Sequence, residues 1–341
     1  MGVSNKKIRV LVVDDSLVFR EAIKRGISKD GYIDVVGVAA DPYIARDMIL
    51  DLEPDVLTLD VEMPKMNGIE FLRRLLPQYP IPVVVVSAVN DSVFSALDTG
   101  AVDFVSKPDV CKKEDLDRFI SELVMKIKIA SVSKIKVLTE EHIKPVVSGF
   151  KNNSKIIAVG ASTGGTEAFY EVLKGFPADM PGVVVVQHMP PVFTRMYAER
   201  LNRSCEMEVK EAETGDIIKK GRVLIAPGGY QMAVYKENNN YYVKCLEGEN
   251  VNGHCPSVDV MFESIAKVAP KEAIGVILTG MGNDGAKGLL NMRKNGSYTI
   301  GQDEKTSVVY GMPMVAYNIG AVIKQTSLER IPEAIYECLK K

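Results

Sequence analysis

Short runs of β-branched and other apolar residues recur along the first 130 residues, and a segment with helical spacing follows each of them. The runs lie at residues 8–13, 34–40, 55–60, 83–88 and 101–106. A strand that is apolar on both faces must be covered on both faces, and a helix is the usual crossover between parallel strands. The pattern therefore predicts five βα units that form a doubly wound parallel sheet.

A second α/β pattern begins at residue 155, after a stretch that has no clear period. Pro145 and Gly149 interrupt that stretch, residues 131–153, which we interpret as an interdomain linker. The chain is then predicted to contain two domains, 1–130 and 154–341. Strand candidates of the second domain lie at 155–160, 182–187, 222–227 and 273–280.

Three consecutive asparagines, residues 238–240, separate two further strand candidates, 231–237 and 241–247. Asparagine favours the tight turns that join antiparallel strands, so this segment predicts a hairpin. The second domain is therefore expected to be mostly parallel α/β with an antiparallel hairpin.

Composition excludes several classes of protein. The 42 Lys and Arg residues nearly balance the 44 Asp and Glu residues, with a net charge of −2, which excludes a generally basic nucleic-acid-binding protein. The five cysteines form no CxxC pair, which argues against a zinc ribbon and indicates a reducing compartment. No apolar run reaches the ~18 residues of a membrane span. We expect a cytoplasmic protein without a nucleic-acid partner and without direct membrane insertion.

Acidic side chains follow the strand candidates of the first domain. Asp14 and Asp15 end the first run, and Asp60 ends the third. Ser87 ends the fourth run, and Lys107 follows the fifth. The carboxyl ends of parallel strands meet at one edge, where converging carboxylates need a cation, and Mg²⁺ prefers such oxygen ligands. This set of residues would stabilise a phosphoryl group that is transferred to a carboxylate.

Residues 6–130 resemble the receiver domain of response regulators, chiefly in the run from Asp60 to Gly68. The resemblance implies a flavodoxin-like fold in which Asp60 accepts a phosphoryl group from a histidine kinase. It implies a Mg²⁺ site formed by Asp14, Asp15, Asp60 and the backbone carbonyl of Glu62. It also implies that the residues responding to phosphorylation are Ser87, Phe104 and Lys107.

A Gly-x-Ser-x-Gly motif lies directly after the strand candidate that opens the second domain. Its serine is Ser162, followed by Thr163 and Gly164. Small flanking residues allow a tight turn that presents a nucleophile, and the N–H groups at the start of the next helix can bind an oxyanion. The motif alone is equally compatible with a glycine-rich turn that contains a serine N-cap.

Two further strand candidates end in residues that complement Ser162. His188 follows residues 182–187, and Asp284 follows residues 273–280. A histidine can act as the base for serine, and a carboxylate can orient the imidazole. The sequence therefore predicts a Ser-His-Asp triad at one edge of the second sheet.

Two alternatives remain open. Ser162, Asp216 and His254 have the chain order of α/β-hydrolase triads, but they do not all lie at predicted strand ends. Residues 280–285 match Gly-x-Gly-x-x-Gly, with Asp303 further on, as in dinucleotide-binding loops. In that interpretation Asp284 would lie inside the phosphate loop and repel a pyrophosphate, so a nucleotide cofactor is disfavoured.

Residues 154–341 resemble the catalytic domain of the chemotaxis receptor-glutamate methylesterases. The supporting motifs lie at residues 160–165, 187–190, 225–229, 254–259 and 279–285. The resemblance implies that Ser162 is the nucleophile, His188 the base and Asp284 its partner. It also implies that the surroundings of the active site include Thr163, Gly164, His254 and Met281. Two positions depart from the family pattern, which often has His in place of Gln231 and Arg in place of Cys255.

Together, the two resemblances imply a phosphorylation-activated esterase. Its substrates would be glutamyl methyl esters of methylated chemotaxis receptors, and it would also deamidate glutamines on them. The esterase domain itself would need no cofactor. The alternative is a phosphorylation-dependent binding regulator with a vestigial catalytic domain, and reaction with a serine-directed fluorophosphonate would distinguish the two. A transcription factor is disfavoured because the second half has no helix-turn-helix pattern or basic stripe.

Overall fold

The computed structural model describes residues 6–88, 92–108, 113–134 and 155–340. The chain divides into two compact units, residues 1–140 and 141–341. Most of the predicted linker lies outside the described residues, as do Cys111 and His142. Each unit is described by itself below.

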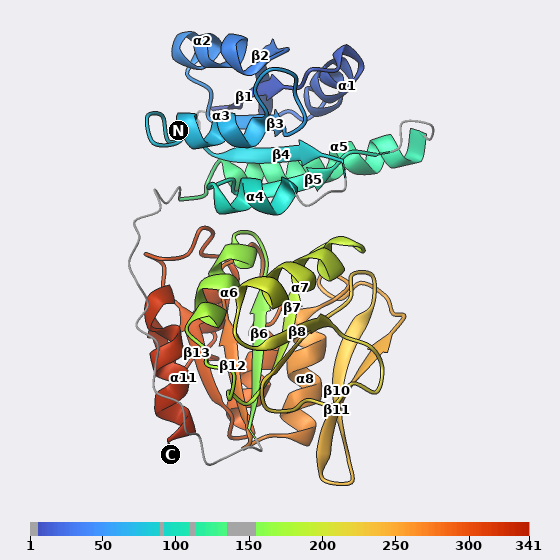
Figure 1. Ribbon diagram of the computed structural model, residues 1–341, viewed down its shortest axis with the longest axis vertical. Coiled ribbons are helices and arrows are strands. Elements are labelled where there is room, and N and C mark those ends of the chain that lie inside the picture. The colour runs from blue at the N-terminus through green and yellow to red at the C-terminus, as the bar shows by residue number, and fades with distance from the viewer. Residues whose placement is uncertain (1–5, 89–91, 109–112, 135–154, 341) are drawn as a thin grey trace, which may run out of the picture. The chain divides into compact units, whose positions relative to one another are not determined.

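The amino-terminal unit contains a five-stranded parallel sheet in the order β2-β1-β3-β4-β5 (Figure 1). Its strands are β1 (Ile8–Val13), β2 (Ile33–Ala39), β3 (Val56–Asp60), β4 (Val83–Ser87) and β5 (Asp103–Ser106). Every residue of β3 and β4 is buried, which explains their continuous apolar character. The predicted doubly wound, flavodoxin-like sheet is confirmed, and its strand order reverses between β1 and β3, where such folds bind ligands.

Helices cover both faces of this sheet. α1 (Leu17–Ile27) packs against α5 (Lys113–Ala130) on one face. The helices of the other face are α2 (Pro42–Leu52), α3 (Gly68–Leu75) and α4 (Ser92–Asp98). The side chains of Ser16, Asp41 and Asn67 accept hydrogen bonds from the first turns of α1, α2 and α3, so short polar residues set where these helices begin.

The carboxyl-terminal unit contains a seven-stranded sheet in the order β14-β13-β12-β6-β7-β9-β8, in which every pair is parallel. The strands are β6 (Ile156–Ala161), β7 (Gly182–Gln187), β8 (Glu208–Glu211), β9 (Arg222–Ile225), β12 (Ala273–Ile277), β13 (Tyr298–Gln302) and β14 (Lys324–Thr326). Strands β8, β13 and β14 were not predicted from the sequence. β8 and β14 are short, polar edge strands, and β13 mixes polar residues with glycine.

Two layers of helices enclose this sheet (Figure 1). One layer contains α6 (Gly165–Lys174), α7 (Phe193–Ser204) and α11 (Ile331–Leu339). The other contains α8 (Val258–Val268), α9 (Ala286–Lys294) and α10 (Met312–Asn318).

The predicted antiparallel hairpin is confirmed. β10 (Gln231–Glu237) and β11 (Asn240–Leu246) form a separate two-stranded sheet, and β10 packs on α8. Asn238 and Asn239 form the turn, with φ of 46° and 66°. Asparagine tolerates this left-handed conformation better than most residues, which is why the asparagine run was informative.

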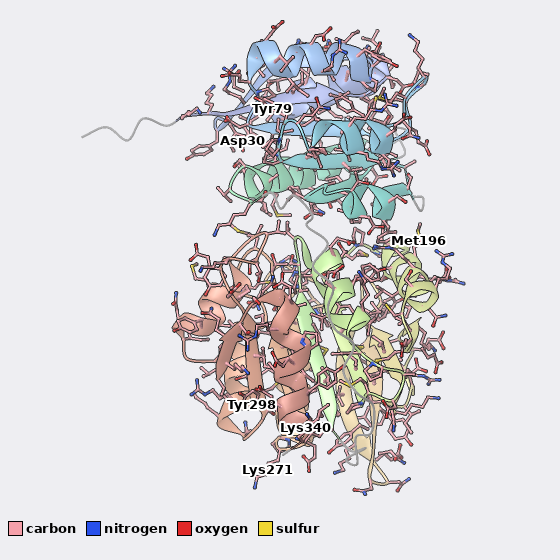
Figure 2. The ribbon with its side chains drawn as sticks, turned by 60° about the vertical axis from the view of Figure 1, so that its left-hand side comes forward. Asp30, Tyr79, Met196, Lys271, Tyr298 and Lys340 are labelled. Carbon is pink, nitrogen blue, oxygen red and sulfur yellow. The ribbon has the colours of Figure 1, made fainter. Side chains whose placement is uncertain are left out.

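The two ends of the carboxyl-terminal unit carry opposite edges of its sheet. Figure 2 shows Met196, in the first turn of α7, at one end, and Lys271 and Tyr298, where β12 and β13 begin, near the other. The first of these ends therefore holds the carboxyl edge, at which α/β sheets bind ligands. Among the described residues, no helix is long and apolar enough to cross a membrane.

Candidate functional site

Three carboxylates and a lysine meet at the carboxyl edge of the amino-terminal sheet. Asp14, Asp15 and Asp60 each offer an oxygen, and these oxygens all lie within 4.8 Å of one another. Lys107 Nζ lies 2.5 Å from Asp60 Oδ2 and 2.7 Å from Asp14 Oδ2. Asp14 and Asp60 are buried, whereas Asp15 is exposed. The structure thus brings together the acidic residues that sequence reasoning placed at separate strand ends.

The electrostatics of this cluster fit a divalent cation. Burial, together with the charge of Asp14, raises the pKa of Asp60 above its ordinary value, although the Lys107 ammonium opposes that shift. A raised pKa means that the ionised carboxylate is poorly stabilised by the protein alone. Mg²⁺ prefers carboxylate oxygens, and its charge would stabilise the ionised form. The three carboxylates therefore fit the implied Mg²⁺ site.

The other predicted residues of the receiver lie on β4, on β5 and in the turn after β3. Ser87 is the last residue of β4, which pairs with β3, and its buried Oγ has no hydrogen-bond partner among the described residues. Such a hydroxyl is available to a phosphoryl oxygen. Phe104, on β5, is buried beneath Lys126 Nζ, which lies 5.0 Å from the ring centroid. The Glu62 N–H donates to Asp60 Oδ1 at 3.1 Å.

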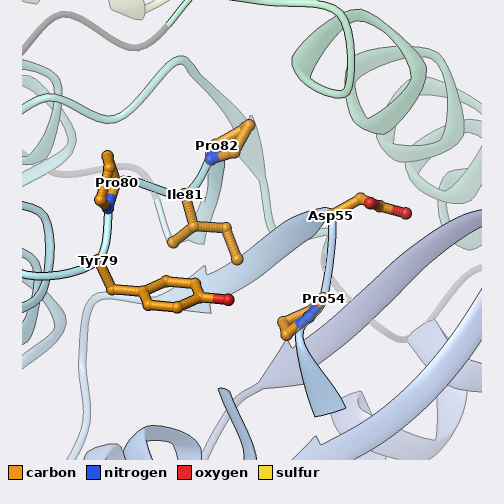
Figure 3. A pocket seen from close by; sticks show the side chains of 6 residues that line it. All are labelled: Pro54, Asp55, Tyr79, Pro80, Ile81 and Pro82. Atoms are coloured by element: carbon orange, nitrogen blue, oxygen red, sulfur yellow. The ribbon is translucent and has the colours of Figure 1, made fainter. Parts of the chain in front are cut away.

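A pocket in the same unit lies at the opposite edge of the sheet (Figure 3). It is lined by Pro54, Asp55, Tyr79, Pro80, Ile81 and Pro82. These residues lie in the segments just before β3 and β4, at the amino ends of the two strands. Asp60 and Ser87 lie at the carboxyl ends of the same strands. The pocket is therefore separate from the acidic cluster.

In the carboxyl-terminal unit, the turn after β6 holds Ser162 tightly. The Ser162 N–H donates to Thr279 O at 3.0 Å, and Ser162 O accepts from the Gly165 N–H at 2.7 Å. A Cβ on Gly280 would lie 2.7 Å from Ser162 Cβ, so only glycine allows this close approach. α6 begins at Gly165, and its first N–H groups lie at the turn that carries the serine.

His188 and Asp284 lie on either side of that turn. β6 is flanked by β7, which ends just before His188, and by β12, which leads to Asp284. His188 Nε2 lies 2.8 Å from Asp284 Oδ2. The other ring nitrogen, Nδ1, is buried and has no partner among the described residues. Nδ1 is therefore the nitrogen that remains to take a proton from Ser162.

Asp284 lies at the amino end of α8, where it is held on all sides. It accepts hydrogen bonds at 2.7–3.2 Å from Asn252 Nδ2, Ser257 Oγ, and the N–H groups of Val258 and Asp259. Burial alone would raise its pKa, but the bonds from His188, Asn252 and Ser257 lower the pKa below its ordinary value. The carboxylate is thus ionised at neutral pH and can stabilise an imidazolium.

His254 lies against His188 and does not pair with Asp216. Its ring stacks on that of His188, with centroids 3.6 Å apart and an interplanar angle of 12°. Burial, with a contribution from His188, lowers the pKa of His254 to about 4, so His254 is neutral at pH 7. Asp216, its partner in the alternative triad, pairs instead with Lys210 Nζ at 3.0 Å.

Of the two departures from the family pattern, Gln231 has a clear structural role. Gln231 is buried and its Nε2 donates to Glu249 O at 3.0 Å and to His254 O at 3.2 Å. Its Oε1 accepts from the Ser257 N–H at 2.8 Å, so Gln231 holds the loop that carries His254. Burial raises the pKa of the Cys255 thiol, which makes this thiol a poor nucleophile at neutral pH.

The glycine-rich loop at residues 280–285 is explained by packing in the triad. A Cβ on Gly285, whose φ is 84°, would lie 2.5 Å from Val258 Cγ1. Asp284 points into the network at the start of α8, and Met281 is 48% exposed. The first and last glycines of the dinucleotide-like pattern, Gly280 and Gly285, thus have packing reasons in this fold.

Sequence reasoning missed two residues that support Asp284. Asn252 and Ser257 both donate to its carboxylate. Asn252-Gly253 is a turn signal, and Ser257 precedes the apolar run of α8, so each was recognisable as a local feature. Neither signal indicates the long-range contact with a residue at the end of another strand.

Comparison with known proteins identifies relatives of both units. Residues 157–335 match the CheB methylesterase family, and residues 10–120 match the response regulator receiver domain. A protein-glutamate methylesterase/protein-glutamine glutaminase from Syntrophomonas wolfei is 57% identical over 98% of this chain and 99% of its own length. A protein with the same name from Syntrophotalea carbinolica is 51% identical over 98% of this chain and 99% of its own length. The crystal structure of the Thermotoga maritima CheB methylesterase catalytic domain is 37% identical, covering 56% of this chain and 99% of its own, with a TM-score of 0.53.

Proposed function

Because the chain belongs to the CheB methylesterase family and carries a receiver domain, we propose that it is a phosphorylation-activated serine esterase. Its substrates are glutamyl methyl esters on methylated chemotaxis receptors, and it also deamidates glutamines there. The observation that carries this proposal is the His188–Asp284 pair beside the Ser162 turn. A vestigial catalytic domain would have no need to keep His188 hydrogen-bonded to a buried carboxylate, so this contact argues against that alternative.

The proposed reaction assigns one role to each of Ser162, His188 and Asp284. Ser162 Oγ attacks the ester carbonyl while His188 Nδ1 takes its proton, and Asp284 stabilises the imidazolium. N–H groups at the start of α6, beginning near Thr163 and Gly164, stabilise the oxyanion. His188 returns the proton to the departing methanol, and water then hydrolyses the acyl-enzyme. These side chains provide nucleophile, base and orienting group, so the esterase requires no cofactor.

The receiver supplies the control. A histidine kinase donates a phosphoryl group to Asp60, and Lys107 and Ser87 stabilise the transferred group. Asp14, Asp15 and Asp60, with the backbone carbonyl of Glu62, would hold Mg²⁺, which would supply positive charge at the phosphoryl-transfer site. Such an enzyme works in the cytoplasm, on receptor segments that are exposed there.

The test is a Ser162→Ala substitution in the full-length protein. Methanol release from methylated receptor fragments should fall by several orders of magnitude, because the nucleophile is lost. Phosphorylation of Asp60 by acetyl phosphate should be unchanged, since that site lies in the other unit. Retention of more than about a tenth of the wild-type rate of methanol release would contradict the assignment of Ser162.

A further inference from the structure

A buried amide joins the two loops that carry Ser162 and His188. Gln187 is the last residue of β7, and its side chain is 4% exposed. Its Nε2 donates to Ser162 O at 2.9 Å and to His188 O at 3.2 Å. We propose that Gln187 is a positioning residue that sets the placement of the nucleophile relative to the base. The reaction it serves is the one proposed above.

The orientation of this amide follows from its partners. Both partners are backbone carbonyl oxygens, which only accept hydrogen bonds, so the NH₂ group must face them. The Oε1 atom then points the other way, and it is buried without a partner among the described residues. A buried, unpaired acceptor is energetically unfavourable. An apolar side chain would avoid that cost but could not bond either carbonyl.

Packing against α6 prevents the amide from moving. A Cβ on Gly165 would lie 2.3 Å from Gln187 Oε1 and 2.6 Å from Ala161 Cβ. The absence of a side chain at Gly165 therefore provides the space that the amide fills. The amide is braced between the start of α6 and the two carbonyls that it bonds.

The hydrogen bond to Ser162 O also affects the oxyanion site. Ser162 O accepts from both Gln187 Nε2 and the Gly165 N–H, so the orientation of this carbonyl is fixed. In a planar trans peptide, the N–H of the next residue points opposite to the carbonyl. Gln187 therefore sets the direction of the Thr163 N–H, as well as the position of Ser162.

This arrangement predicts an effect on turnover and not on substrate binding. The Gln187 side chain has no titrating group and faces the backbone, so it does not take part in proton transfer. Misplacement of a reacting group by about 1 Å can cost about 100-fold in rate. Loss of the amide should therefore lower kcat about 10- to 100-fold and leave KM within about twofold.

The experiment compares full-length wild-type protein with Gln187→Met, which has a similar volume and cannot donate a hydrogen bond. We expect Gln187→Met to have a lower kcat for methanol release than wild type and an unchanged KM. We also expect a fluorophosphonate to label Ser162 more slowly in this variant. Gln187→Glu, which keeps the shape but places acceptors against both carbonyls, should be at least as slow. Labelling requires only a reactive serine, so slow labelling of Gln187→Met supports the positioning role even if the wild type releases no methanol.

A matched control is Thr299→Val in β13. Thr299 is fully buried, and its Oγ1 donates to Ala321 O at 2.6 Å and accepts from the Ile323 N–H at 3.1 Å. This variant loses comparable buried hydrogen bonds away from Ser162, so it should be less stable yet label at the wild-type rate. The proposal is overturned if Gln187→Met labels at the wild-type rate, or if Thr299→Val slows labelling equally.

Discussion

The carboxylate of Asp284 selects which nitrogen of His188 can act as the base. It bonds Nε2, so the proton on that nitrogen is held and Nδ1 is left as the acceptor. The two ring nitrogens therefore exchange places relative to a serine protease. In that enzyme class the carboxylate bonds Nδ1, and Nε2 faces the serine. Either ring nitrogen of a neutral imidazole can accept a proton when the other carries the hydrogen, so this orientation is compatible with the proposed role of His188.

An Asp284→Asn substitution should test this selection. The amide would donate to Nε2, which forces the proton onto Nδ1 and leaves no acceptor for Ser162. We expect kcat to fall by about 10³-fold or more with little change in KM. Kinetics of methanol release would measure this. Asp216→Asn is the matched control because Asp216 pairs with Lys210, and a damaging effect there, with Asp284→Asn near neutral, would require the triad to be redrawn around His254.

His254 should make the stability of the protein depend on pH. Its pKa is lowered to about 4 in the folded protein, against 6.5 when unfolded, so the unfolded chain binds a proton more readily. Its contribution to stability is therefore present above pH 6.5 and is lost as the pH falls towards about 4. We expect urea unfolding to show a smaller loss of stability over this window in His254→Phe than in wild type. Equal losses in both proteins would contradict the shifted pKa.

At the scale of elements, the sequence predicted those parts of the fold in which local pattern and burial agree. β3, β4, β6 and β7 are buried along their whole length, and their apolar runs were recognisable. β8 and β14 depend on a neighbouring strand for their structure, and their polar sequences carry little signal. Placing residues at carboxyl strand ends was enough to predict that Asp14, Asp15 and Asp60 cluster and that His188 lies beside Asp284.

The supports of the triad could not be predicted in the same way. Asn252 and Ser257 reach Asp284 only because the start of α8 is packed beside the loop after β12. Gln187 ends a predicted strand, but whether it faces solvent or two carbonyls depends on the adjacent turn. Such contacts arise from tertiary packing, for which a single sequence has no periodic signature.

The strand-end cluster of the receiver predicts dependence on a metal. Acetyl phosphate should label Asp60 when Mg²⁺ is present and fail to label it after EDTA treatment, because the clustered carboxylates need a cation to accept a further anion. Mass spectrometry of the intact protein would measure the labelling. Asp60→Asn should remain unlabelled under both conditions. Labelling that survives EDTA would contradict the metal site.

At the scale of the whole molecule, one chain carries two groups of residues that are suited to different chemistry. The acidic cluster belongs to the amino-terminal unit and the triad to the carboxyl-terminal unit. Covalent linkage keeps the two units at an effective concentration of about millimolar, so even a weak interaction between them would be populated. Phosphate on Asp60 could then change esterase activity by changing such an interaction.

We therefore expect the unphosphorylated receiver to restrain the esterase. The fragment 152–341 should hydrolyse a methylated receptor substrate faster than the intact unphosphorylated protein, and acetyl phosphate with Mg²⁺ should bring the intact protein towards the rate of the fragment. The Thermotoga maritima catalytic domain, which aligns with this unit over 99% of its length, was crystallised as a separate domain, so such a fragment is a reasonable reagent. A shift of about 1.4 kcal/mol in the interaction would change the rate about tenfold when the restrained state predominates.

Asp60→Asn in the intact protein, treated in the same way, controls for direct effects of acetyl phosphate. If the fragment is no faster than the intact unphosphorylated protein, restraint is wrong, and phosphorylation must act by increasing the affinity of the enzyme for its receptor.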